Sequence, residues 1–487
     1  MFKTLITQTN WSLLGTVYGF VIGFFVKMYL VNRVGADAFG LYSIAQGFQS
    51  AVTTFIGFSV PSILVKFLPR FLKKESFSEE ATVLSTQSLV FLLTVSLVST
   101  LAIVVLNSFI AVHVFHKENL ATIIAISALY MPLTMYMAYI MSVYRAFLKI
   151  KEIIIYGTLY VITIRALLTF LVYSFSQDIV WFMWIEIFSQ LVAVILLTRH
   201  FHSEKMKLVE ISALSKPLPE KETILRYGKT IYSNTLVSFS SGYILTFLMS
   251  ILLPAKAMGI FAILGAIAGL TNFLQANINK VFAPIISTLV AQEEHKQLAL
   301  LYRESTFLMN ILTIPFILSA VLFSRYILGL YGEEFTHYTL ELTLFFLANY
   351  FSLMVGSSGM MMMMGGLEKE ELKLQVFQLI FVLVAALIFI PLYGLLAAIL
   401  IRFASMFIIN QTEVYYIYKR FRIWPWDIAS TALILLFFIC IIIFYKLSYH
   451  SYGIVDFFLY PFFTYFLFLI LFSSKLKNIY IIFKKSR

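Results

Sequence analysis

The sequence has few charged residues and a single cysteine. Charged residues make up 12% of the 487 residues, against about 25% in an ordinary soluble domain. Hydrophobic residues make up 61%, and the mean hydropathy is +0.90. This composition excludes a water-soluble protein. Because Cys440 lies alone within an apolar run, a disulfide framework and a cysteine-based metal site are excluded as well.

The chain also lacks the motifs of soluble catalysis. No glycine-rich phosphate loop occurs, so the chain does not drive transport by its own ATP hydrolysis. The seven histidines are scattered, and their spacing does not indicate a metal site. The formal net charge is +12, but the basic residues do not gather on a soluble segment that could contact nucleic acid. We therefore expect no cofactor, no metal ion and no nucleic-acid partner.

Long apolar runs recur from one end of the sequence to the other. Each has about 20 residues, the length that crosses the hydrocarbon core of a bilayer as a helix. The runs predict an all-α integral membrane protein with about fourteen transmembrane helices. The predicted helices are 11–32, 39–60, 82–106, 120–142, 153–175, 179–198, 228–252, 257–279, 305–324, 338–364, 372–391, 395–418, 427–446 and 453–473. The first run is too long for a signal-peptide core and lacks a small-residue cleavage pattern, so we expect it to be retained.

One polar segment interrupts this pattern near the middle of the chain. It contains Pro217 and Pro219 among Lys and Glu residues, a composition typical of a loop. The predicted organisation is an N-terminal six-helix lobe (1–198), a cytoplasmic linker (199–227), a C-terminal six-helix lobe (228–418), and an extra transmembrane pair with a basic cytoplasmic tail (419–487).

The distribution of Lys and Arg gives an independent prediction of topology. With the N-terminus in the cytoplasm, about 28 of the 36 basic residues fall on the cytoplasmic side, as the positive-inside rule requires. One helix more or fewer would have removed this asymmetry. We expect both termini to be cytoplasmic.

Two pairs of segments indicate an internal repeat. Residues 38–44 begin the second predicted helix, and the similar residues 257–263 begin the eighth. At the same spacing, 146–152 and 365–371 each lie between the fourth and fifth helices of their half. The matches predict two parallel six-helix halves, related by an axis along the membrane normal, with the substrate path between them.

Polar residues at helical spacing mark faces that do not contact lipid. Such faces indicate either a water-filled path or hydrogen-bonded packing between helices. The amide residues that we assign as substrate-binding candidates are Gln46, Gln49, Asn234, Asn272 and Gln275.

Four of the charged residues within predicted transmembrane helices are singled out here: Lys27, Arg165, Glu186 and Arg402. Each costs roughly 2.5 to 3.5 kcal/mol on insertion scales, which makes them functional candidates. Arg165 and Glu186 lie at similar depth in consecutive helices, so they either form a structural ion pair or act in binding or ion coupling. Arg402 has no obvious acidic partner at its depth, and an anionic substrate would supply the counter-charge. Lys27 lies near the outer end of its helix, where it either lines the path or extends to the surface.

The beginning of the chain resembles a known family. Residues 10–12 (Asn-Trp-Ser) and 32–42 (Asn-Arg-Val-Gly-Ala-Asp-Ala-Phe-Gly-Leu-Tyr) resemble the start of polysaccharide export proteins, the O-antigen and capsule flippases. These belong to a superfamily with the multidrug and toxin extrusion (MATE) transporters and the lipid II flippases. The resemblance implies two six-helix lobes that form a V around a central cavity, with two appended helices.

The resemblance also implies a function. It indicates a non-enzymatic flippase of the bacterial cytoplasmic membrane that moves an undecaprenyl-diphosphate-linked oligosaccharide outward by alternating access. Membrane lipids and other polysaccharide-assembly proteins would be its partners. A cationic cavity, typical of the family, would suit Lys27, Arg165 and Arg402. Two alternatives stay open: a cation-coupled multidrug or small-molecule exporter of the same fold, and a membrane glycosyltransferase or polymerase.

Overall fold

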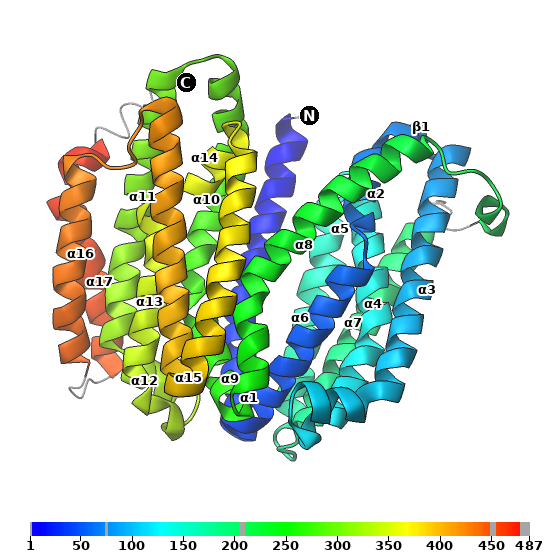
Figure 1. The fold of residues 1–487 in the computed structure, drawn as a ribbon, viewed down its shortest axis with the longest axis horizontal. Helices are drawn as coiled ribbons and strands as arrows, with labels where there is room; N and C mark the ends of the chain where they lie inside the picture. Colours follow the sequence, from blue (N-terminus) through cyan, green and yellow to red (C-terminus); the bar gives the residue numbers. More distant parts are fainter. Residues whose placement is uncertain (1, 74–75, 204–209, 449–453, 478–487) are drawn as a thin grey trace. The chain divides into compact units, whose positions relative to one another are not determined.

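The computed structural model describes residues 2–73, 76–203, 210–448 and 454–477, which fold almost entirely into helices (Figure 1). The exception within these ranges is a short antiparallel pair of strands, β1 (Leu72–Lys73) and β2 (Ser76–Phe77). By their contacts, the helices divide into two compact units, residues 1–259 and 260–487.

Two long helices each contain two of the predicted transmembrane helices. These are α1 (Phe2–Ile56) and α15 (Glu368–Phe421), which bend at Gly35 (φ 79°) and Gly394 (φ 58°). Glycine adopts this left-handed region without the steric penalty of a side chain. In α15 the two arms lie side by side, because Gln378 Nε2 donates a hydrogen bond to Ser405 Oγ at 3.0 Å. Figure 1 shows the bend of α15 as a sharp reversal.

The first unit is built from helices packed around a continuous apolar core. After α1 come α2 (Val60–Phe67), α3 (Glu79–Phe109), α4 (Ala121–Ala146), α5 (Ile150–Ile154), α6 (Tyr160–Val172), α7 (Ile179–Ser203) and α8 (Lys221–Leu252). Its core includes Leu64, Tyr139, Val143 and Leu197, all fully buried. Such a core fixes the helices that carry the polar residues discussed below.

The second unit has its own core. After α9 (Ala255–Ala268), its helices are α10 (Leu270–Ala291), α11 (His295–Leu322), α12 (Ser324–Gly329), α13 (Thr339–Met354), α14 (Ser358–Met364), α15, α16 (Ile428–Leu447) and α17 (Ile454–Leu471). The buried residues Leu298, Met362 and Ile417 form part of this core.

The observed helices differ from the predicted ones mainly at breaks and ends. The predicted helix 257–279 is interrupted at Gly269 and continues to Ala291. The predicted helix 338–364 is interrupted at 355–357, where Gly356 has φ 72°. The segment predicted as linker is partly helical, because α8 begins at Lys221.

Eleven helical stretches of the described chain are long and apolar enough to cross a membrane. Two of them are α1 and α15, and the 54 residues of α15 would extend to about 80 Å if straight, more than twice the roughly 30 Å hydrocarbon core. Each of these two helices can therefore cross twice. A shorter apolar helix, Leu459–Leu471, is also present. The chain is a multi-pass membrane protein, and the total of fourteen crossings stays a prediction.

The two copies of the first repeat meet inside the first unit, where α1 crosses the start of α9. A Cβ atom on Gly40 would lie 1.8 Å from the carbonyl oxygen of Ala255, and one on Gly259 would lie 2.0 Å from that of Ala36. Both distances are far below contact, so only glycine permits this crossing. Small residues four apart bring membrane helices this close. The contact is reciprocal, with equivalent residues of each repeat copy facing each other.

Candidate functional site

The centre of the candidate site is an ion pair between α6 and α7. Arg165 Nη1 lies 2.9 Å from Glu186 Oε1, and the side chains are 24% and 8% exposed. The short connection between the two helices brings both residues to the same depth. The ion-pair geometry considered as one alternative from the sequence is therefore present. Whether Arg165 also contacts a substrate stays a prediction.

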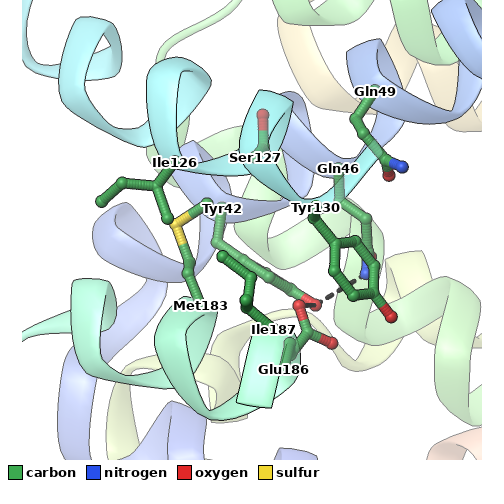
Figure 2. A pocket seen from close by; sticks show the side chains of 9 residues that line it. All are labelled: Tyr42, Gln46, Gln49, Ile126, Ser127, Tyr130, Met183, Glu186 and Ile187. Carbon is green, nitrogen blue, oxygen red and sulfur yellow. Dashed lines mark hydrogen bonds between the residues drawn. The ribbon is translucent and has the colours of Figure 1, made fainter. Parts of the chain in front are cut away.

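A hydrogen-bond chain extends this ion pair to α1. Tyr42 Oη donates to Glu186 Oε2 at 3.0 Å, and Gln46 Nε2 donates to Tyr42 Oη at 2.7 Å. Figure 2 shows the three side chains converging, with both hydrogen bonds dashed. Tyr42 was not among the residues selected from the sequence, although it lies one helical turn before Gln46. Both oxygens of the Glu186 carboxylate thus have a partner.

A small cavity of about 20 Å³ adjoins this chain. Gln49 and Tyr130 line it together with Tyr42, Gln46 and Glu186 (Figure 2). A space of this size holds about one water molecule. The cavity can therefore hydrate the polar cluster, but it cannot hold a sugar.

Lys27 adds a second positive charge near the pair. Its side chain is exposed, and it interacts electrostatically with Glu186 and Arg165. Among the residues that the structure describes, it has no hydrogen bond or ion pair. One turn away, a Cβ atom on Gly23 would meet nothing within 4 Å, so this face of α1 is open within the first unit. With two basic groups and one acid, this cluster carries excess positive charge.

Arg402 lies in the second unit, on the second arm of α15. Its Nη2 donates to Asn349 Oδ1 at 3.0 Å, and its guanidinium carbon lies 5.2 Å from the centre of the Phe345 ring, within cation–π range. No carboxylate of the described chain lies within ion-pair distance, and its Nε is buried without a hydrogen-bond partner. Arg402 is therefore a half-buried cation whose charge is not neutralised by the described residues. Asn349 was missed in the sequence, where it is a single amide in an apolar helix.

Three of the remaining amide candidates, Gln275, Asn234 and Asn272, do not join either group, whereas Gln49 lines the small cavity beside the ion pair. Gln275 Nε2 donates to Ser352 Oγ at 3.2 Å and to the Gly356 carbonyl at 3.1 Å, contacts that hold α10 against α13. Gln49 Nε2 donates to Thr134 Oγ1 at 3.4 Å. Asn234 and Asn272 are exposed. The structure thus brings together Lys27, Gln46, Gln49, Arg165 and Glu186, whereas the other candidates lie elsewhere.

A buried carboxylate in the second unit received no role from the sequence. Glu186, Glu304 and Glu413 are each 6% exposed. The first two have cationic partners, since Lys475 Nζ lies 2.6 Å from Glu304 Oε1. Glu413 receives a hydrogen bond from the Ser358 hydroxyl and has no cationic partner in the described chain. In the described chain no group of three or more His, Cys, Asp or Glu residues could hold a metal ion.

Solved structures of transporters share this fold. A lipid II flippase, MurJ, in an inward closed conformation aligns with a TM-score of 0.70 and 13% identity, over 96% of this chain and 99% of that one. An inward-facing multidrug resistance MATE family transporter of the MOP superfamily aligns with a TM-score of 0.64 and 14% identity, over 84% of this chain and 94% of that one. A MOP superfamily transporter from Pyrococcus furiosus, described as having a binding pocket of reverse polarity, aligns with a TM-score of 0.56 and 14% identity, over 86% of this chain and 96% of that one.

Comparison with curated protein sequences gave no match. The sequence model of one family, described as polysaccharide biosynthesis protein, matches residues 5–290. This range is more than half of the chain and contains the Arg165 and Glu186 ion pair with its hydrogen-bond chain. The chain therefore belongs to the polysaccharide biosynthesis protein family.

Proposed function

We propose that the protein is a flippase that moves an undecaprenyl-diphosphate-linked oligosaccharide, such as an O-antigen or capsule repeat unit, across the membrane. Membership of the polysaccharide biosynthesis protein family carries this proposal. The MurJ fold supports it, because that protein flips a lipid-linked substrate. The chain would act as a transporter and not as an enzyme.

The unneutralised cations support an anionic substrate. Arg402 is half-buried without an acid in the described chain, and Lys27 gives the Arg165 cluster an excess positive charge. Phosphate oxygens accept paired hydrogen bonds from guanidinium, a geometry that lysine does not reproduce. A diphosphate bound at either group would supply the counter-charge that this group lacks.

The glycine crossing supports alternating access. Two helices meet here through backbone atoms at Gly40 and Gly259, a close approach that small residues permit, and we take this crossing as the pivot of the motion. In this proposal the lobes 1–198 and 228–418 move about this crossing and expose the path to each side in turn.

Location and partners follow from the same proposal. The protein would lie in the bacterial cytoplasmic membrane with both termini in the cytoplasm, as the basic-residue asymmetry predicts. Other polysaccharide-assembly proteins would supply and consume its substrate.

The alternative of a cation-coupled multidrug exporter is favoured by one observation. Glu413 is a buried carboxylate without a cation in the described chain, and a cationic drug or coupling ion would neutralise it. Glu186, the acidic candidate from the sequence, is paired with Arg165 and does not offer such a site. Drug accumulation in cells that express Glu413→Gln would measure this activity directly.

The test of the proposed function is surface glycan after deletion of the gene in its host. The wild-type chain should restore surface glycan and remove the accumulated lipid-linked oligosaccharide. Arg402→Lys should restore less, and Arg402→Ala less still, at equal amounts of protein in the membrane. The control is Arg325→Ala, because Arg325 is exposed on α12. Unchanged surface glycan after gene deletion would refute the function, whereas full restoration by Arg402→Ala would refute only the role of Arg402.

A further inference from the structure

A second cavity in the first unit is much larger than the polar one. Its volume is about 600 Å³, within the roughly 300 to 1,000 Å³ typical of small-molecule sites. We call it the α2/α3/α8 cavity. Its apolar lining includes Val60 and Ile63 from α2, Leu84 and Phe91 from α3, and Ile224 and Leu225 from α8.

The polar groups in its wall are largely occupied by other contacts. Gln87 Nε2 donates to the backbone carbonyls of Ala213 (3.2 Å) and Lys216 (2.7 Å). The Tyr232 hydroxyl donates to the Phe55 carbonyl at 2.7 Å. The wall therefore offers few free hydrogen-bond donors to an occupant. Such an apolar surface is suited to binding a hydrocarbon chain.

Phe58 presents its ring to this cavity from a constrained backbone position. Its φ is 43°, a left-handed conformation that is an outlier for a bulky residue. The ring stacks on Tyr232 with centroids 4.9 Å apart and meets the edge of Phe91 at 5.6 Å, yet Phe58 remains 46% exposed. Outliers of this kind gather at ligand sites.

One charged residue lines the cavity. Lys229 is exposed, and among the described residues its ammonium has no hydrogen bond or ion pair. The acid immediately before α8, Glu220, is paired with Arg70 at 3.7 Å. Arg226, one turn before Lys229, is also exposed and has no partner in the described chain. The edge of the cavity is therefore suited to an anion.

The position of the cavity identifies the occupant. It lies along the first turns of α3 and α8, two helices that are candidate membrane spans, on the side predicted to be cytoplasmic, where anionic lipids are concentrated. An apolar cavity with a free cation at its edge suits an anionic amphiphile.

We propose that the α2/α3/α8 cavity binds one acyl chain of an anionic phospholipid, with Lys229 contacting its phosphate. The volume suits a single acyl chain, whereas an eleven-unit isoprenoid would need far more space. This site does not depend on the proposed substrate, because it is separate from the Arg165 and Glu186 cluster. A structural lipid held here would tie α8 to α2 and α3.

The test is native mass spectrometry of the protein from nanodiscs that contain either phosphatidylglycerol or phosphatidylcholine. The wild type should retain one phosphatidylglycerol, and Lys229→Gln should weaken that retention at least about tenfold, the loss expected for a charge-assisted hydrogen bond. Ser88→Phe should abolish it by filling the cavity that Ser88 lines. Lys221→Gln is the control, because Lys221 is exposed at the start of the same helix and does not line the cavity.

A measurement on the unmodified protein covers the case in which a variant fails to fold. A diazirine on the acyl chain of phosphatidylglycerol should label the wall segments 84–91 and 224–232. Labelling of other segments alone, or equal retention of both lipids, would overturn the proposal. Labelling of these segments by a polyprenyl phosphate probe but not by phosphatidylglycerol would overturn it in favour of an isoprenoid site.

Discussion

Removing one partner of the Arg165 and Glu186 ion pair should destabilise the protein at least as much as removing both. Arg165→Ala leaves the Glu186 carboxylate, 8% exposed, with the Tyr42 hydrogen bond alone. Loss of one partner from a buried pair costs roughly 3 to 5 kcal/mol. Because the Arg165 side chain is 24% exposed and water can replace part of the lost interaction, we expect the lower end, about 3 kcal/mol.

The double variant Arg165→Ala with Glu186→Ala removes both charges together. It loses the Tyr42 hydrogen bond, for about 1 to 3 kcal/mol, but leaves no unpaired charge. With a loss of about 3 kcal/mol for Glu186→Ala as well, the two single losses together exceed the double loss by about 3 to 5 kcal/mol, which is the coupling free energy expected in the double-mutant cycle.

The assay is unfolding in mixed detergent micelles, followed by circular dichroism, for all four members of the cycle. Surface glycan measured in the same variants separates structure from binding. If Arg165 only neutralises Glu186, the double variant should recover the function that Arg165→Ala loses. If Arg165 binds substrate, the double variant should be stable and inactive. Arg165→Ala with the stability of the wild type would refute the energetic reasoning.

Three further predictions follow from single contacts. Glu413→Gln should leave stability unchanged or raise it, because glutamine keeps the shape without the unpaired charge; a loss above about 2 kcal/mol in the same unfolding assay would show that an ionised Glu413 has a favourable partner. Gly40→Leu should abolish transport and lower the yield of folded protein, because a side chain there meets the Ala255 carbonyl; wild-type glycan display would contradict the crossing. Burial alone would raise the pKa of Asp427, but hydrogen bonds from Lys475 and Ser430 hold that pKa below its usual value. The stability that these hydrogen bonds to the Asp427 carboxylate contribute is present above the pKa of the unfolded state and is lost as pH falls through the pKa of the folded state. Asp427→Asn should therefore destabilise the protein at neutral pH and flatten the acid limb of its stability profile, and an unchanged profile would argue against the contact.

The positions of the membrane helices could be predicted from the sequence because hydrocarbon thickness sets a length that every apolar run must satisfy. Breaks such as those at Gly269 and Gly356 could not be predicted, since a break buried in protein leaves the run equally apolar. The bends at Gly35 and Gly394 could be placed between predicted helices, but the sequence did not show that the helices continue through them.

The site could be predicted from the sequence only where a charged residue lies in a membrane helix, because its insertion costs free energy. The depth of Arg165 and Glu186 on consecutive helices anticipated their pairing, because charges in hydrocarbon need partners. Tyr42 and Asn349 escaped notice, since a tyrosine or a single amide in an apolar helix is compatible with ordinary packing. Their roles depend on which helix packs against them. The pattern of residues along one helix does not show which helix that is.

The most direct measurement of the central claim is transbilayer movement of a lipid-linked oligosaccharide in vesicles that contain the purified protein. A membrane-impermeant glycosidase cleaves the glycan in the outer leaflet, and the remainder reports the inner leaflet. The account predicts that the wild-type protein makes the inner-leaflet pool accessible as well, and that Arg402→Ala does so more slowly. An inner pool that stays protected, as in vesicles without protein, would contradict the claim that the chain is a flippase for this substrate.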